Sequence, residues 1–335
     1  MTSKNMSLKN KPFLLKPVGK DYLWGGRRLN DDFSKDIPLH PLAETWECST
    51  HPDGPSVVAS GEFKGLSLAE VLRLQPELLG RHYAGLGELP ILIKLIDAKK
   101  DLSVQVHPDD EYAFQHEKGQ RGKTEMWYVL DASRDAQLVY GFSHDIERAA
   151  LEKSLLDGTV EKYLQKVPVH SDDIFFIKPG TVHAIGAGAL IAEIQESSNL
   201  TYRLFDYNRM DKNGKKRELH IEKALAVVNM QGSARPKQPL RVLKYRRGYA
   251  AEMLCRCKYF QVERVLVNTE RCRELASFQS NSDSFQVLLC TNGCGIMTFG
   301  DGEVLQLFRG DCVFLPADSL EVKVHGKLQM LVVSA

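Results

Sequence analysis

Two short segments of this chain carry potential metal ligands at a spacing that suits β-strands. In the segment 103–107, the alternation of an extended strand puts Gln105 and His107 on one face. The same alternation puts Lys123 and Glu125 side by side at the start of a second predicted strand. An amide oxygen, an imidazole and a carboxylate are therefore available to one metal ion, with a lysine beside them.

A fourth ligand has to come from further along the chain. His183 follows the turn Pro179-Gly180 and is a good candidate. Imidazole nitrogens with a carboxylate oxygen suit zinc, but also iron(II), manganese or cobalt, so the ligand types leave the metal open. The predicted metal ligands are Gln105, His107, Glu125 and His183.

Cationic side chains accompany this predicted site. Lys94 interrupts an apolar strand pattern over 90–96, although lysine is rarely buried without a partner. One carboxylate against a divalent cation leaves a positive charge, to which Lys94, Lys123 and Arg203 add. A pocket of this kind favours an anionic substrate, and phosphate suits lysine and arginine donors.

Each of these residues also has an ordinary structural explanation. A single histidine is more often hydrogen-bonded or exposed than a ligand, and we expect this of His116, His144 and His170. Gln105 alone would be an exposed strand residue, and Lys123 with Glu125 a surface pair. The functional interpretation depends on their coincidence.

The composition is that of an ordinary soluble globular protein. The 335 residues are enough for two domains, with 43% apolar and 26% charged residues. A net charge of +1 gives no electrostatic reason to expect nucleic acid or an acidic membrane as partner. The apolar patch at 12–15 is too short for a signal peptide. Seven cysteines, an odd number clustered late, favour reduced thiols and a cytoplasmic location.

Helices are predicted in three places, at about 66–80, 145–165 and 219–229. The first begins with a capping box formed by Ser67 and Glu70. Residues 43–49 and 57–58 are predicted to form a hairpin around the turn Asp53-Gly54-Pro55. The segment 231–239 is the clearest linker, so we predict domains 1–235 and 236–335. Four strands are predicted in the second domain, at 260–265, 285–289, 295–299 and 328–333.

A faint internal repeat supports two related β-domains. Residues 173–180 resemble residues 311–317, and only the first copy is followed by a histidine, His183. A duplicated domain with one metal site and one degenerate site explains this pattern. The sequence therefore predicts a mainly β protein.

Several motifs together resemble the short, Bacillus-like type I mannose-6-phosphate isomerases, from about residue 12 to the C-terminus. The segment 102–108 is the most specific match, because its Gln-x-His-Pro replaces the two histidines usual in other cupins. The other matching segments are 20–26, 44–52, 122–125, 179–184 and 200–207. The resemblance implies tandem cupin domains (jelly-roll β-barrels) with a helical insertion. It also implies one zinc ion per chain and a C-terminal cupin domain without a metal site.

The resemblance further implies an aldose–ketose isomerase that interconverts D-mannose 6-phosphate and D-fructose 6-phosphate through a cis-enediol. The expected partner is thus a small sugar phosphate. Lys123 and Glu193 are the candidates for the general base, and Glu193 could instead orient a ligand. Arg203 and Lys94 are expected to bind phosphate or to stabilise the enediolate.

Two other functions remain open at this point. His107, Glu125 and His183 alone could form the two-histidine, one-carboxylate iron site of a cupin oxygenase. A non-enzymatic sugar-phosphate sensor could use the same scaffold. The three cations favour a sugar phosphate, whereas they are unexplained for an apolar oxygenase substrate. The oligomeric state and the role of the C-terminal domain stay open.

Overall fold

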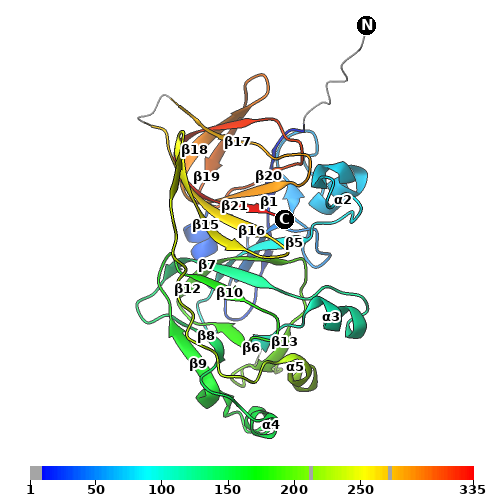
Figure 1. Ribbon diagram of the computed structural model, residues 1–335, viewed down its shortest axis with the longest axis vertical. Coiled ribbons are helices and arrows are strands. Elements are labelled where there is room, and N and C mark those ends of the chain that lie inside the picture. The colour runs from blue at the N-terminus through cyan, green and yellow to red at the C-terminus, as the bar shows by residue number, and fades with distance from the viewer. Residues whose placement is uncertain (1–9, 211–213, 271–273) are drawn as a thin grey trace. The chain divides into compact units, whose positions relative to one another are not determined.

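The computed structural model describes residues 10–210, 214–270 and 274–335. These residues form a mainly β protein, as predicted, with short helices between the strands (Figure 1). They divide into two compact units. One unit comprises the chain up to Val18, Glu47–Pro90 and Leu240–Ala335, and the other comprises Gly19–Trp46 and Ile91–Pro239. No helix in the described ranges is long and apolar enough to cross a membrane.

The unit that contains residues 91–239 is built from two antiparallel sheets. The first has the order β10-β7-β12-β5-β3-β2, and the second has the order β13-β6-β11-β8-β9. The strands of the first are β2 (Val18–Lys20), β3 (Glu44–Cys48), β5 (Ile91–Asp97), β7 (Glu125–Ala132), β10 (Ile174–Ile177) and β12 (Ala189–Glu196). Those of the second are β6 (Val104–Val106), β8 (Gln137–Phe142), β9 (Leu164–Pro168), β11 (His183–Ile185) and β13 (Tyr202–Phe205).

One hydrophobic core joins these two sheets. Ile96 and Trp127 come from the six-stranded sheet, and Leu138 and Ile185 come from the five-stranded sheet. All four side chains are at most 2% exposed. Packing of this kind needs alternate residues of each strand to be apolar, and the other alternate residues are then free to carry polar groups.

Short helices cover the five-stranded sheet. Leu151 and Leu155 of α4 (Arg148–Leu156) share a core with Leu225 of α5 (Ile221–Val227) and with strand β6. The remaining helical elements of this unit are α1 (Arg28–Asp31), α3 (Asp110–His116) and η2 (Val160–Tyr163). Helices thus lie within the segments predicted at 145–165 and 219–229.

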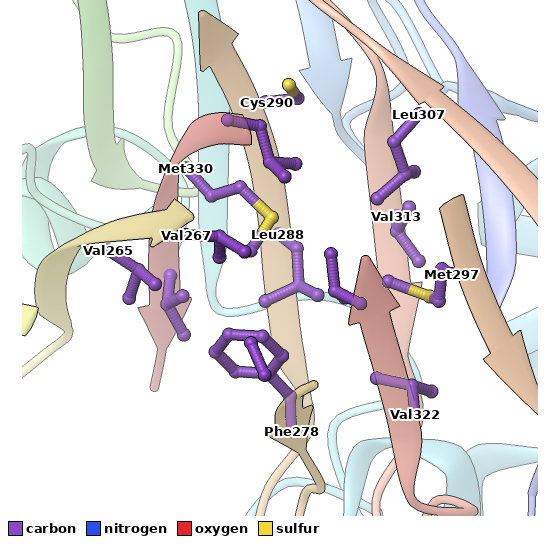
Figure 2. Close-up of a cluster of buried hydrophobic side chains, with 14 of the residues drawn as sticks. Val265, Val267, Phe278, Leu288, Cys290, Met297, Leu307, Val313, Val322 and Met330 are labelled. Atoms are coloured by element: carbon purple, nitrogen blue, oxygen red, sulfur yellow. The ribbon is translucent and has the colours of Figure 1, made fainter. Parts of the chain in front are cut away.

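The other unit contains a ten-stranded sheet with the order β14-β15-β16-β21-β18-β20-β1-β4, in which β19 pairs with β18 and β17 with β21. Its strands are β1 (Phe13–Lys16), β4 (Val57–Val58), β14 (Lys244–Arg246), β15 (Tyr249–Arg256), β16 (Gln261–Asn268), β17 (Ala276–Phe278), β18 (Gln286–Phe299), β19 (Glu303–Phe308), β20 (Cys312–Leu315) and β21 (Val322–Ser334). Figure 2 shows its core, in which Leu288, Met297 and Met330 lie among valines from neighbouring strands. Both copies of the internal repeat form strands, β10 and β20.

Two predictions about strands were wrong. The segments at 44–48 and 57–58 do not pair as a hairpin, because β4 pairs with β1 and β3 belongs to the six-stranded sheet. The strands predicted at 285–289 and 295–299 are one strand, β18. A register shift between Cys290 and Asn292 and a left-handed Gly293 (φ 77°) let the chain pass through the expected break.

The predicted domains 1–235 and 236–335 stay a prediction, whereas the compact units are discontinuous in sequence. Among the described residues no two cysteines are joined by a disulfide. Cys272 lies outside the described residues.

The capping box predicted at the start of α2 (Leu68–Leu74) is present, with η1 (Pro76–Leu79) following the helix. Ser67 Oγ accepts a hydrogen bond from the Glu70 amide at 3.2 Å, and Glu70 Oε2 accepts one from the Ser67 amide at 2.8 Å.

We predict that Ser67→Ala lowers the free energy of unfolding by about 1 kcal/mol, because an amide of the first turn loses its acceptor. Urea denaturation measures this loss.

Ser67→Thr is the matched control, since it keeps the hydroxyl acceptor. An alanine variant as stable as the threonine variant would contradict the contribution of the cap.

Candidate active site

Three neighbouring strands of the five-stranded sheet carry polar residues in direct register. Gln105 on β6 lies opposite His183 on β11, and on its other side it lies opposite Arg203 on β13. Residues directly opposite one another in an antiparallel pair project from the same face of the sheet. The register therefore brings together one amide, one imidazole and one guanidinium from distant parts of the sequence.

His107, Glu125 and His183 form a buried cluster, each at most 1% exposed. Their candidate ligand atoms all lie within 4.8 Å of one another. His107 Nε2 is 3.3 Å from Glu125 Oε1, and His183 Nε2 is 3.6 Å from Glu125 Oε2. The two Nε2 atoms are 3.1 Å apart. Three of the four predicted metal ligands are thus in mutual contact.

The donor groups of this cluster fit a divalent cation. His183 Nδ1 lies 2.8 Å from the Thr181 carbonyl oxygen, which is a hydrogen bond if Nδ1 carries the proton and which leaves the Nε2 lone pair facing the cluster. Neither carboxylate oxygen of Glu125 has a hydrogen bond of good geometry. A buried carboxylate is costly without a cation; Lys123 supplies one at Oε1, whereas Oε2 has no hydrogen-bond donor among the described residues. Nitrogen and carboxylate donors are ligands that zinc and iron(II) accept.

The protonation states agree with metal binding. Burial, together with Lys123, lowers the pKa of His107 to about 3, and burial also lowers the pKa of His183. Both imidazoles are then neutral near pH 7. Burial opposes ionisation of Glu125, but Lys123 and His107 outweigh it and hold its pKa well below the ordinary value. Lys123 Nζ lies 2.6 Å from Glu125 Oε1 as its ion-pair partner.

Lys94 and Glu193 form a second buried charge pair, on two neighbouring strands of the six-stranded sheet. They lie directly opposite each other on β5 and β12, with Lys94 Nζ 3.1 Å from Glu193 Oε1. Trp127 Nε1–H donates a hydrogen bond to Glu193 Oε2 at 2.9 Å. Lys94 is also 3.9 Å from Glu44, a contact that the sequence did not indicate. The charge of this lysine is therefore already balanced by carboxylates.

The pKa values of both partners, Lys94 and Glu193, are raised. Burial disfavours the ammonium of Lys94, but Glu193 and Glu44 outweigh it and raise the pKa of Lys94. Burial and then Glu125 raise the pKa of Glu193, whereas Lys94 acts in the opposite direction. A buried carboxyl with a raised pKa is a frequent feature of catalytic sites.

A cavity of about 270 Å³ opens beside the cluster. All five of the other predicted site residues line it: Lys94, Gln105, Lys123, Glu193 and Arg203. Trp24 also contributes to its wall, whereas Trp46 is fully buried and does not line it. The cavity walls are thus rich in charged and amide groups next to the candidate metal ligands.

Arg217 also lines this cavity, and sequence reasoning missed it. It stands in a run of charged residues, 215–218, which by itself is typical of a solvated surface. Across the cavity wall, Arg203 donates to the Glu218 carbonyl oxygen at 2.8 Å and to Ser103 Oγ at 3.3 Å. Among the described residues no carboxylate forms an ion pair with Arg203, so its charge remains available.

Comparison with known proteins places this chain in a family. Residues 13–133 match the family model of the phosphomannose isomerase type I catalytic domain. Residues 251–335 match the model of the mannose-6-phosphate isomerase cupin domain. The tandem arrangement inferred from the internal repeat is consistent with this second match.

Curated relatives and a solved structure match nearly the whole chain. The mannose-6-phosphate isomerase ManA of Bacillus subtilis is 36% identical over 96% of this chain and 98% of that protein. The putative mannose-6-phosphate isomerase YvyI of the same organism is 34% identical over the same shares of the two chains. The crystal structure of the mannose 6-phosphate isomerase from Bacillus subtilis has a TM-score of 0.86 and 33% identity, covering 97% of this chain and 100% of that one. The chain therefore belongs to the mannose-6-phosphate isomerase family and has its cupin fold.

Proposed function

We propose that this chain is a metal-dependent isomerase that interconverts D-mannose 6-phosphate and D-fructose 6-phosphate. One observation carries the proposal: a buried His107–Glu125–His183 cluster adjoins a cavity lined by cations. The cluster offers ligands for a metal, and the cations suit a phosphorylated substrate. The names of the relatives support this substrate.

We assign zinc to Gln105, His107, Glu125 and His183, one ion per chain. Gln105 completes the set because it lies opposite His183 on the neighbouring strand. A mannose 6-phosphate isomerase of the same fold, with 17% identity and a TM-score of 0.75, has been solved with zinc and yttrium bound. When bound, the metal would polarise the carbonyl and hydroxyl oxygens of the sugar and stabilise the enediolate charge.

Arg203 and Arg217 are our candidates for binding the phosphate. Both residues line the cavity, and the hydrogen bonds of Arg203 go to neutral oxygens. Lys94 fits the other role expected for it, stabilisation of enediolate charge, because Glu193 already balances its ammonium. Arginine suits phosphate better than lysine, since its planar fork can donate two parallel hydrogen bonds.

Glu193 is our candidate for the base. Isomerisation of the aldose removes the proton on C2 and returns a proton to C1, so the base must both accept and donate near neutral pH. The raised pKa of Glu193 suits this exchange, and its carboxylate lines the cavity. Lys123 is bound to Glu125, which fits a role in orienting the reacting hydroxyl.

The other two functions fit less well. A cupin oxygenase would use the same three ligands, but Arg203, Arg217 and the Lys94–Glu193 pair have no role beside an apolar substrate. A sensor would not need a buried carboxyl with a raised pKa next to the metal ligands. An isomerase accounts for all of these groups.

The first test is removal of the metal. We expect the purified protein to convert mannose 6-phosphate into fructose 6-phosphate, to lose this activity on chelation and to regain it with zinc. A proton NMR time course measures both sugars. The thermal midpoint should also fall on chelation, because a ligand of the folded state stabilises it. Turnover that survives complete chelation would contradict the metal assignment.

A second prediction distinguishes an isomerase from a sensor. Glu125→Gln removes the only carboxylate of the predicted ligand set, so an isomerase should lose turnover and zinc stoichiometry together. A sensor should lose little beyond affinity for the sugar phosphate. Turnover assays, zinc analysis and sugar-phosphate titration of one preparation separate these outcomes.

A third prediction concerns the base. Glu193→Gln should lower kcat by about 10²–10⁴-fold with little change in KM, because the amide cannot take the C2 proton. Exchange of that proton with deuterium from solvent, followed by NMR, should slow in parallel. Glu161→Gln, an exposed glutamate outside the cavity, serves as the control. If Lys123→Gln stops the exchange and Glu193→Gln does not, the base is Lys123.

A further inference from the structure

One buried carboxylate holds two arginines, and one of them, Arg217, lines the cavity. Asp206 follows strand β13 directly and is 5% exposed. Its side chain forms ion pairs with Arg209 and with Arg217. Burial opposes ionisation of Asp206, but the hydrogen bonds from Arg217 and Arg209 outweigh it and lower its pKa. The trio therefore carries two positive charges and one negative charge.

The two arginines use their donors differently. Arg209 donates to the Asp206 side chain and carbonyl oxygen and to the Asp101 carbonyl oxygen, and it does not line the cavity. Arg217 approaches Asp206 side-on, with Nε 2.9 Å from Oδ2 and Nη2 hydrogen-bonded to Oδ1. A side-on pair of this kind leaves the Nη1 group of Arg217 without a bond to the carboxylate.

The chain around Arg217 is fastened to β13 at several further points. Arg203 donates to the Glu218 carbonyl oxygen. The Arg203 amide lies 3.1 Å from His220 Nδ1, and the His220 amide donates to the Arg203 carbonyl oxygen at 2.8 Å. These contacts place the backbone at Glu218 and His220, on the C-terminal side of Arg217. Among the described residues, it is the Asp206 carboxylate that accepts hydrogen bonds from the Arg217 guanidinium itself.

We propose that Asp206 is a positioning residue that holds the Arg217 guanidinium at the cavity wall, with its Nη1 donors available to the substrate phosphate. The inference rests on the proposed function, since it assigns the phosphate to this side of the cavity. Asp206 does not touch the substrate. It lowers the entropic cost of binding, because a long arginine side chain is already held in one rotamer before the phosphate arrives.

The negative charge of Asp206 also has an opposite effect on the affinity for phosphate. The carboxylate is a negative charge near the phosphate, and repulsion alone predicts tighter phosphate binding when it is removed. Positioning predicts weaker binding, because Arg217 would lose its fixed orientation. The sign of the change in affinity therefore separates the two effects.

The experiment is a double-mutant cycle of Asp206→Ala and Arg217→Gln in the full-length, metal-loaded protein. KM and kcat are measured with mannose 6-phosphate, and the dissociation constant of inorganic phosphate is measured by its effect on the thermal midpoint. We expect Asp206→Ala to raise KM and the phosphate dissociation constant by about ten-fold, which is the size of one weakened charged contact. We expect kcat to stay within about three-fold, because the reacting carbons are remote from the phosphate.

In the Arg217→Gln background, Asp206→Ala should change neither constant by more than about two-fold, because the residue it positions is gone. An equal effect in both backgrounds overturns the proposal, as does an unchanged or lowered KM. Asp206→Asn completes the series: it keeps the shape and one acceptor, and it should give an intermediate KM. If the alanine variant does not fold, the same cycle is run with asparagine.

Arg209→Gln is the matched control. It removes the other partner of the same carboxylate while leaving the Asp206–Arg217 pair, so KM should stay within about two-fold of the wild type even if stability falls. An equal rise in KM would show a general loss of local structure and overturn the proposal. The phosphate titration does not depend on turnover. It therefore tests Asp206 even if mannose 6-phosphate proves not to be the substrate.

Discussion

The buried contact between two imidazoles and a carboxylate is the constraint on which the site depends. His107, Glu125 and His183 are shielded from water, and the carboxylate oxygens have no well-formed hydrogen bond. Lys123 already pairs with Oε1 of this carboxylate, and a metal ion would give the remaining buried donor atoms a partner, which lowers the cost of burying them. Glu125 and His183 come from β7 and β11, which contribute side chains to one core, and His107 follows β6 directly.

The cations around this cluster differ in whether a carboxylate pairs with them. Lys94 faces Glu193 and Glu44, and Lys123 faces Glu125, so these ammonium groups are largely balanced inside the protein. Arg203 differs, because within the described chain its hydrogen bonds go to neutral oxygens. Arg203 therefore contributes a positive charge to the cavity wall that no carboxylate of the described chain pairs with. A cavity with such a charge suits a substrate that carries an anionic group.

The two copies of the internal repeat form one strand in each of the two units. The strands β10 and β20 come from the similar sequence segments, and each lies within a sheet of its own unit. The metal-type cluster was found in one unit, and within the described residues no second cluster of at least three His, Cys, Asp or Glu residues accompanies it. A core cluster of the other unit consists of apolar side chains such as Leu288, Met297 and Met330 (Figure 2). A scaffold whose core is apolar throughout needs no ligand for stability.

The sequence by itself determined features that depend on neighbours within a few residues. Strand alternation predicted Gln105 beside His107 and Lys123 beside Glu125, and Lys123 and Glu125 are in contact. The Ser67–Glu70 capping box follows from helix geometry alone. Only the tertiary structure decided which strands pair. Strand β4 pairs with β1 rather than with β3. Arg217, which has the sequence context of a surface residue, lines the cavity. The physical reason is that local conformation depends on adjacent backbone and side chains. Pairing and register depend instead on which apolar faces can be buried together across long stretches of chain.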